Sequence, residues 1–405
     1  MKRVMNFLIL ILTGVSVACQ KPDPKPADPI KPADSSKLEL VWKTPLASGN
    51  SSISSFNPIA YNGITAFAGV TSTTQTVQAF DVQNGQKKWE LAVCNGIGDN
   101  PIGQNFMIAE CENEMSVVNL DNGQLSWYYK VDGGMPRLTI INDLIYHRQG
   151  GPGLRMPYMH LVRSPLAQAQ WDTVFTLYRD SIGGYTPFIE SPTLWINPQG
   201  EEVLLFQNRS WNFDTSDGKI DFYAYNLSTQ KVQFILEDID PSGNSNVVTP
   251  LVDGNYAYFL GARSVSCIDL LEGNVVWQNL FYGDGAHALT SNLLIVGNKL
   301  IVKQDHDLIS AFDKFSGDEE WIRGEVGFTP SHMAYHDGII YYTADGDGKL
   351  FAVNASNGRI IWAEDSPNEG EVPASFNGGV AIDPVNRLIF VADRYYAMAF
   401  KLPER

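Results

Sequence analysis

Short runs of β-branched and aromatic residues alternate with turn residues from Leu38 to the end of the chain. Strands of globular proteins have this pattern, and no segment of the region shows the 3.6-residue hydrophobic period of an amphipathic helix. Tight-turn signals such as Asn62-Gly63 and Asp253-Gly254 separate the runs at regular intervals. The chain is therefore predicted to be all-β and built of antiparallel meanders.

A repeated motif places Ala, Asp, Gly and Trp at relative positions 1, 3, 7 and 11. The set Ala79, Asp81, Gly85 and Trp89 fits it fully. Six further copies keep the spacing, most of them with substitutions, and their aromatic positions are Trp127, Trp171, Phe234, Trp277, Trp321 and Trp362. Internal repeats of about this length are typical of solenoids and propellers.

The two ends of the chain supply one more copy between them. Ala399 begins the motif, but the chain stops at Arg405 before an aromatic residue is reached, whereas Trp42 lies in a strand that has no motif front. The N-terminal strand is expected to complete the last sheet, because a closed ring leaves no open sheet edges. Residues 38–405 are thus predicted to form an eight-bladed β-propeller of four-stranded antiparallel blades.

The motif resembles the tryptophan-docking repeat of the PQQ-like, quinoprotein-type β-propeller superfamily, and the resemblance covers nearly the whole chain beyond residue 37. It implies that each motif tryptophan packs between the position-1 side chain of its own blade and the position-7 glycine of the next. Seven tryptophans are expected to be structural on this basis: Trp42, Trp89, Trp127, Trp171, Trp277, Trp321 and Trp362. A platform of these tryptophans for a cofactor or sugar is the alternative.

The N-terminus has the form of a lipoprotein signal peptide, because Lys2 and Arg3 precede a mainly apolar run from Val4 to Ala18. This run is shorter than the ~20 residues that a helix needs to cross a bilayer. The segment before Cys19 resembles a bacterial lipobox, which implies cleavage after residue 18 and acylation of Cys19. An ordinary signal peptide that contains a cysteine is the alternative.

Residues 19–37 are rich in proline and nearly free of apolar side chains, so we expect an extended tether that leaves only the lipid in the membrane. Residues after Cys19 also resemble the export signals of some Bacteroidetes lipoproteins. The whole chain carries a formal net charge of −16 and contains no basic run, which argues against nucleic acid as a partner. The expected location is the outer membrane, on its periplasmic or exposed side.

Quinoprotein dehydrogenases of the superfamily hold their cofactor beside a disulfide of adjacent cysteines, and this chain has no adjacent pair. We therefore expect neither PQQ nor another cofactor. Cys94 and Cys111 are predicted to emerge on one face of a blade, and a disulfide between them or two free thiols are both open at this point. Cys267 stands at a small buried motif position, where an inert thiol is expected.

The histidines do not have the close spacing of metal ligands. His287 and His332 both fall at innermost-strand positions near the central channel, where a solvated funnel lining is favoured over a two-histidine metal site. No catalytic motif of a hydrolase, phosphate loop or carboxylate pair is present. The sequence leans against an enzyme, although a hydrolase or lyase with an unrecognised site remains an alternative.

Insertions break the repeat mainly in the third and fourth blades, at residues 148–158, 180–188 and 208–219. Functional residues on repeat scaffolds are usually found in such insertions. All three are predicted on one face and carry the arginines and aromatics that binding hot spots use: Arg148, Arg155, Tyr158, Tyr185, Phe188, Arg209, Trp211 and Phe213. Insertions that merely pack on one another are the alternative.

At the level of the fold the chain also resembles the BamB-type outer-membrane assembly lipoprotein, a scaffold that docks its partner through loops on one face. The leading hypothesis is a monomeric, membrane-tethered scaffold that binds an envelope protein or peptide. The second hypothesis is a glycan or small-molecule binder that uses the central funnel. Fold alone does not decide between them.

Overall fold

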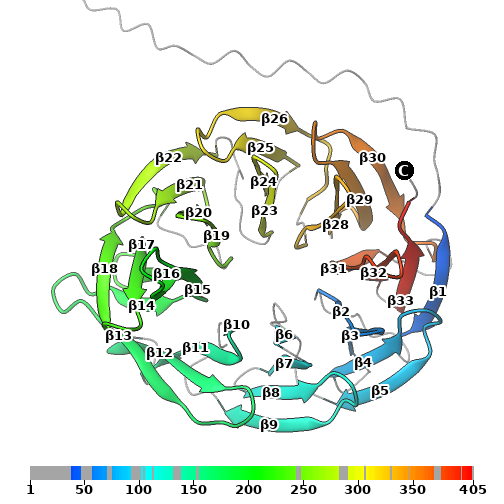
Figure 1. Cartoon of the computed structure of the whole chain (residues 1–405), viewed down its shortest axis with the longest axis horizontal. Coiled ribbons are helices and arrows are strands. Elements are labelled where there is room, and N and C mark those ends of the chain that lie inside the picture. Colours follow the sequence, from blue (N-terminus) through cyan, green and yellow to red (C-terminus); the bar gives the residue numbers. More distant parts are fainter. Residues whose placement is uncertain are drawn as a thin grey trace, which may run out of the picture.

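The structure is a computed structural model that describes residues 38–46, 57–70, 75–92, 102–103, 105–111, 114–130, 138–151, 155–242, 248–281, 291–304, 307–328, 331–344, 346–368, 375–393 and 395–403. These residues form thirty-three strands and no helix, arranged as eight sheets around a ring (Figure 1). The sequence-based prediction of an eight-bladed β-propeller is confirmed.

Each blade is an antiparallel meander whose first strand lies nearest the centre of the ring (Figure 1). Blade 1 comprises β2 (Ile59–Tyr61), β3 (Ile64–Val70), β4 (Gln75–Asp81) and β5 (Lys87–Ala92). Blade 2 comprises β6 (Ile102–Gly103), β7 (Phe106–Cys111), β8 (Glu114–Asn119) and β9 (Leu125–Lys130). Blade 3 comprises β10 (Leu138–Ile141), β11 (Leu144–Gly150), β12 (Tyr158–Pro165) and β13 (Asp172–Tyr178). Blade 4 comprises β14 (Thr186–Ile189), β15 (Thr193–Ile196), β16 (Glu202–Asn212), β17 (Asp217–Asn226) and β18 (Lys231–Leu236).

The second half of the ring repeats the arrangement. Blade 5 comprises β19 (Leu251–Asp253), β20 (Tyr256–Leu260), β21 (Ser264–Asp269) and β22 (Asn274–Leu280). Blade 6 comprises β23 (Leu293–Val296), β24 (Lys299–Lys303), β25 (Ile309–Asp313) and β26 (Glu319–Arg323). Blade 7 comprises β27 (Ala334–His336), β28 (Ile339–Ala344), β29 (Lys349–Asn354) and β30 (Ile360–Asp365). Blade 8 comprises β31 (Phe376–Asp383), β32 (Leu388–Asp393), β33 (Tyr396–Lys401) and β1 (Leu40–Pro45).

The two ends of the chain close the ring. Strand β1 pairs antiparallel with β33, which places Leu40 opposite Phe400 and Trp42 opposite Ala399. The predicted completion of the last blade by the N-terminal strand is therefore confirmed. The C-terminal blade gains its outermost strand in this way, and no edge of β33 stays open.

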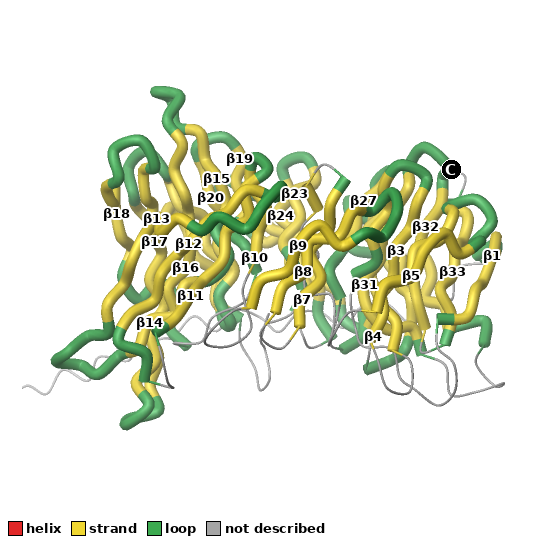
Figure 2. Tube along the Cα trace, turned by 90° about the horizontal axis from the view of Figure 1, so that it is seen from below, coloured by secondary structure: helices red, strands yellow, loops and turns green. Residues whose placement is uncertain are grey.

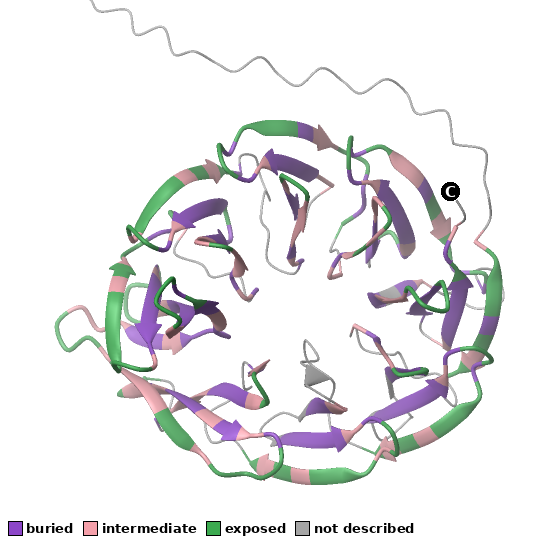
Figure 3. Cartoon of the chain, in the orientation of Figure 1, coloured by how far each residue is buried: buried purple, intermediate pink, exposed green. Residues whose placement is uncertain are grey.

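The hydrophobic core is divided among the contacts between successive blades. Trp42 of blade 8 lies on Gly85 of blade 1, so closely that a Cβ atom on Gly85 would be 2.6 Å from Trp42 Cδ2. Gly123 in blade 2 has the same relationship to Trp89 of blade 1. Glycine is required because a side chain there would collide with the indole. Figure 3 accordingly shows buried residues in the middle strands of the blades and exposed residues along the outermost strands.

Trp171 does not take the docking position that the motif spacing predicts, and this expectation was wrong. The residue opposite the motif position Leu161 is Phe175, whose ring packs against Phe206 and Tyr225 of blade 4. The physical reason is a longer β12–β13 hairpin, which moves the docking aromatic four residues along the chain (175 against 171).

Trp171 instead faces the preceding blade. Its ring centroid lies 6.1 Å from that of Trp127, 4.8 Å from that of Tyr129 and 4.4 Å from that of His147. It packs beside the docked Trp127, whose Nε1 donates a 2.8 Å hydrogen bond to the Leu166 carbonyl oxygen. The residue is structural, but it stabilises the contact between blades 2 and 3.

Blade 4 differs from the four-stranded pattern because its innermost strand is divided. Strands β14 and β15 both pair with β16, so this sheet has five strands. The segment 208–219, which was expected to be a loop insertion, is mainly an extension of the β16–β17 hairpin. Figure 2 shows β14 and the neighbouring loops projecting from the lower edge of the ring.

Candidate binding face

The insertions of blades 3 and 4 come together on one face of the propeller. Residues 148–158 connect β11 to β12, residues 180–188 lead from β13 into β14, and residues 208–219 form the end of the β16–β17 hairpin. Together we call them the insertion face. In an antiparallel meander the connections after the second and fourth strands lie at the same end of the blade, which is why the three segments meet.

Polar contacts cross-link the three segments. Arg155 Nη2 lies 2.5 Å from Asp214 Oδ1 and joins the first insertion to the third. Asn212 Nδ2 donates a 2.7 Å hydrogen bond to the Gly183 carbonyl oxygen, which joins the third insertion to the second. The insertions therefore pack on one another, as the alternative interpretation of the sequence held, and they form one platform.

Tyr185 and Lys219 make a further link between the second and third insertions. The Tyr185 hydroxyl donates a 2.6 Å hydrogen bond to Asp217 Oδ2. Lys219 Nζ lies 4.7 Å from the centroid of the Tyr185 ring. The hydrogen bond to Asp217 raises the pKa of Tyr185, so the phenol stays protonated and continues to donate.

Two arginines lie close to the ring of Phe188. The Cζ atom of Arg148 lies 6.0 Å from the ring centroid, and that of Arg209 lies 5.3 Å from it. Arg148 also forms a 3.3 Å ion pair with Glu190, a carboxylate that is only 4% exposed. Each guanidinium is attracted to the ring face, and the two together hold the aromatic side chain in place.

Arg209 differs from Arg148 in its electrostatic environment. Its Nε is buried without a hydrogen-bond partner, and no ion pair to Arg209 is formed by the residues that the structure describes. An arginine that is stacked on an aromatic ring but has no carboxylate beside it can form an ion pair with a carboxylate of a binding partner.

Apolar side chains beside this arginine reach the solvent. Phe213, at the turn of the hairpin, is 37% exposed, and its ring lies 6.5 Å from that of Phe188. Tyr178 and Ile182, which the sequence interpretation did not single out, are 76% and 97% exposed on the approach to β14. The platform thus combines a fixed interior with an exposed apolar rim.

The remaining predicted residues of this face are half-buried. Trp211 lies on β16 opposite Thr186 of β14. Tyr158 begins β12, and its ring lies 4.5 Å from that of His160. The sequence pointed to the arginines and aromatics but missed the carboxylate partners Asp214 of Arg155 and Asp217 of Tyr185, because nothing in the local spacing links residues of different insertions.

Two histidines were predicted to lie near the central channel. His332 lies two residues before the start of β27, whereas His287 is outside the described residues. Within the part of the chain that the structure describes, no group of three His, Cys, Asp or Glu side chains is placed to hold a metal ion.

Other predicted positions lie outside the described part of the chain. These are residues 1–37, with Cys19 and the tether, and Cys94, while the side chain of Cys111 is also outside it. Cys267 is a fully buried free thiol whose pKa burial raises to about 12. No described segment is a helix with the length and hydropathy needed to span a bilayer.

The sequence matches the family model described as outer membrane protein assembly factor BamB, over residues 33–144 and 304–399. No protein with a curated function matches the chain.

Solved structures with the same fold have very different sequences. BamB from Moraxella catarrhalis is 12% identical, with a TM-score of 0.61 over 91% of this chain and 99% of that one. A europium-containing methanol dehydrogenase is 12% identical, with a TM-score of 0.62 over 87% of this chain and 84% of that one. Saccharomyces cerevisiae Sqt1 is 9% identical, with a TM-score of 0.66 over 91% of this chain and 100% of that one. At such identities the likeness concerns the fold alone.

Proposed function

This chain belongs to the family of the outer membrane protein assembly factor BamB, and we propose that it is a non-catalytic scaffold that binds an envelope protein or peptide through the insertion face. In this proposal the acylated Cys19 anchors the propeller to the outer membrane, and residues 19–37 hold it away from the lipid surface. The family supports a role in binding proteins, and the insertion face is the surface that we assign to it.

The observation that carries the proposal is the position of Arg209 on Phe188, without a carboxylate, beside the exposed Phe213. Arginine and aromatic side chains dominate the energy of protein interfaces when their surroundings keep them fixed. The contacts Arg155–Asp214 and Asn212–Gly183 already join the three insertions in the free protein. A partner would therefore lose little free energy in ordering this surface.

The partner chemistry follows from the same residues. We expect an acidic side chain or a terminal carboxylate to pair with Arg209, and an apolar side chain to cover Phe213 and Ile182. A quinone cofactor is not part of the proposal. The cysteines at positions 19, 94, 111 and 267 are not adjacent, so the disulfide that the quinoprotein dehydrogenases use has no counterpart here.

Site-specific photocrosslinking in intact cells tests this proposal. A photoreactive phenylalanine analogue at position 213 should give a discrete crosslink to an envelope protein. The matched control is Phe315, which is 49% exposed in the connection between β25 and β26, on the opposite face of the propeller from the insertion face. Adding Arg209→Gln should reduce the crosslink at position 213 at least fivefold.

Two outcomes would count against the proposal. Equal crosslinking at positions 213 and 315 would show contact without specificity. No crosslink at position 213, together with binding of the mature domain to a glycan array that Arg209→Gln leaves unchanged, would favour a carbohydrate ligand in the funnel.

A further inference from the structure

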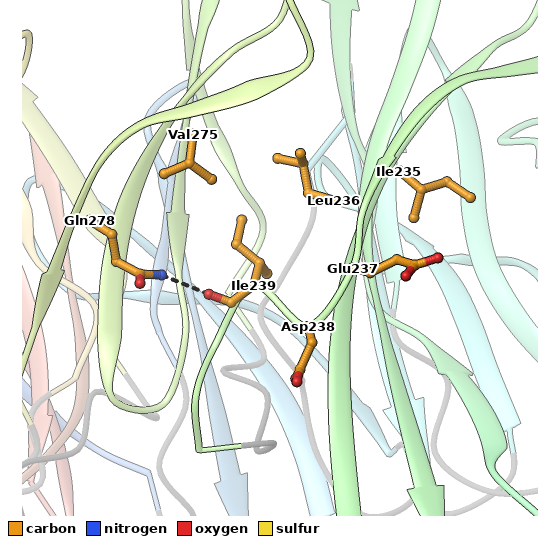
Figure 4. Close-up of a pocket in the computed structure, with 7 residues that line it drawn as sticks. All are labelled: Ile235, Leu236, Glu237, Asp238, Ile239, Val275 and Gln278. Carbon is orange, nitrogen blue, oxygen red and sulfur yellow. Dashed lines mark hydrogen bonds between the residues drawn. The ribbon is translucent and has the colours of Figure 1, made fainter. Parts of the chain in front are cut away.

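A groove runs along the outer wall of the propeller between blades 4 and 5 (Figure 4). It has a volume of about 500 Å³ and is lined by residues 235–239 of blade 4 and by Val275 and Gln278 of blade 5. Gln278 Nε2 donates a 2.7 Å hydrogen bond to the Ile239 carbonyl oxygen, which fixes the two walls relative to each other. The groove is separate from the central channel. Its Asp238 end adjoins the insertion face, because the charge of Asp238 contributes to raising the pKa of Tyr185.

Strand β22, which forms one wall, is unusual among the outermost strands. It contains no charged residue, whereas each of the other seven contains at least one: Lys43, Lys87, Lys130, Asp172, Lys231, Glu319 and Glu364. Charged side chains on edge strands prevent pairing with other chains. The edge of β22 lacks this protection, and it pairs only with β21 among the described strands.

Exposed apolar side chains also gather on this wall. Val275 is 39% exposed, Val276 46% and Leu280 38%, and Ile235 on the facing strand β18 is 41% exposed. An apolar surface of this kind beside an unprotected strand edge is suited to an added strand, whose backbone would pair with the edge and whose alternate side chains would enter the groove.

Carboxylates define the charge of the groove. Glu237 and Asp238 form part of its lining, and the Asp238 amide donates a 3.0 Å hydrogen bond to Asp221 Oδ1. Burial and the neighbouring Glu237 and Asp238 raise the pKa of Asp221. No described lysine or arginine forms an ion pair with these three carboxylates. The groove therefore favours a cationic occupant.

We propose that this outer wall binds an extended segment of a partner protein whose side chains at every second position face the groove, apolar ones at one end and basic ones at the other. The segment adds as a further strand to the free edge of β22, with apolar side chains against Ile235 and Val275. Its lysines or arginines pair with Glu237 and Asp238. A second copy of this chain is a poor occupant, because it would bring the same carboxylates and a net charge of −16 to the contact.

Fluorescence anisotropy tests the proposal on the mature domain with two labelled octapeptides, Lys-Thr-Lys-Thr-Val-Thr-Val-Thr and its reverse, which cover the two strand directions. One of them should bind, whereas the same sequence with glutamate in place of lysine should not. The binding peptide N-methylated at alternate amides should bind at least tenfold more weakly, because it cannot complete the strand hydrogen bonds.

The key variant is Val276→Lys. Val276 is the bulged residue of β22, and Lys88 occupies the equivalent bulge in blade 1, so the fold accepts lysine at this position. The substitution should weaken peptide binding at least tenfold. Ser126→Lys, at the same bulge in blade 2, adds an equal charge elsewhere and should leave binding unchanged.

The double variant Glu237→Gln and Asp238→Asn should weaken binding and flatten its dependence on salt. Equal binding of the lysine and glutamate peptides, or equal effects of Val276→Lys and Ser126→Lys, would overturn the proposal. Self-association in sedimentation that Val276→Lys abolishes would also overturn it, in favour of a second copy as occupant. Arg209→Gln should not affect this assay, which separates it from the function proposed for the insertion face.

Discussion

The indole Nε1 of Trp42 donates a 2.8 Å hydrogen bond to the carbonyl oxygen of Val82, and this contact joins the last blade to the first. Trp89 and Leu120 make the same contact between blades 1 and 2, also at 2.8 Å. The ring is thus closed by the same interaction that connects its neighbouring blades. The insertion face depends on this ring, because its segments come from two adjacent blades that must be held at a constant distance.

Replacing Gly85 by alanine should destabilise the ring at the closure. The new Cβ would lie 2.6 Å from the Trp42 ring, at a residue whose φ is +67°. Overpacking and the left-handed conformation together should lower the free energy of unfolding by about 2 to 5 kcal/mol. Gly63→Ala is the matched control, since its φ is +76° and nothing lies within 4 Å of the added atom. If urea denaturation shows that the two variants lose the same free energy of unfolding, the packing of Trp42 on Gly85 is contradicted.

Phe175 should couple energetically to Tyr225 across the contact between blades 3 and 4, since their ring centroids are 4.9 Å apart. A double-mutant cycle of Phe175→Leu and Tyr225→Leu should give an interaction of about 0.5 to 1.5 kcal/mol in denaturant unfolding. Trp171→Leu combined with Tyr225→Leu should be additive, because the ring contacts of Trp171 are with blades 2 and 3. Additivity for Phe175 and coupling for Trp171 would show that Trp171, and not Phe175, is the docking residue of blade 3.

Acid should destabilise the domain through His147. Burial lowers its pKa to about 4, against 6.5 for an ordinary histidine. The unfolded chain therefore binds a proton that the folded chain does not, and the free energy of unfolding should fall by about 3 kcal/mol as the pH drops from 6.5 to 4. His147→Phe should flatten this part of the pH profile. His160→Phe, the control, should leave most of the slope, and a profile unaffected by His147→Phe would contradict the assignment.

Cys267 should resist alkylation in the folded protein. The thiol is fully buried and burial raises its pKa to about 12, so almost no reactive thiolate is present at neutral pH. Mass spectrometry of peptides after iodoacetamide treatment should find Cys267 modified only when denaturant is added. Modification of the native protein within minutes would show that the contact between blades 5 and 6 opens readily.

The parts of the fold that repeat could be predicted from the sequence. The spacing from Ala79 to Trp89 identified the docking contact, and the lone Trp42 identified the closing strand, because both depend on residues at constant separation. Phe175 could not be found in this way, since a longer hairpin changes the separation within blade 3. The division between β14 and β15 has no motif signal either.

The candidate site was predicted in its residue types and its face, but not in its pairings. Arginines and aromatics in the insertions were visible in the sequence. The contacts Arg155–Asp214 and Tyr185–Asp217 were not, because they join insertions that only the folded ring brings together. The groove beside β22 was missed because the absence of a charge is informative only once the strand is known to be an outer edge.

Hydrogen exchange tests the central claim most directly, namely that the insertion face is where a protein partner binds. The mature domain would be measured alone and with a saturating amount of the partner identified by crosslinking at Phe213. The account predicts slower amide exchange in peptides covering residues 178–188 and 208–219, and unchanged exchange around Phe315. Protection confined to the inner strands around His332, with none in the insertions, would contradict it.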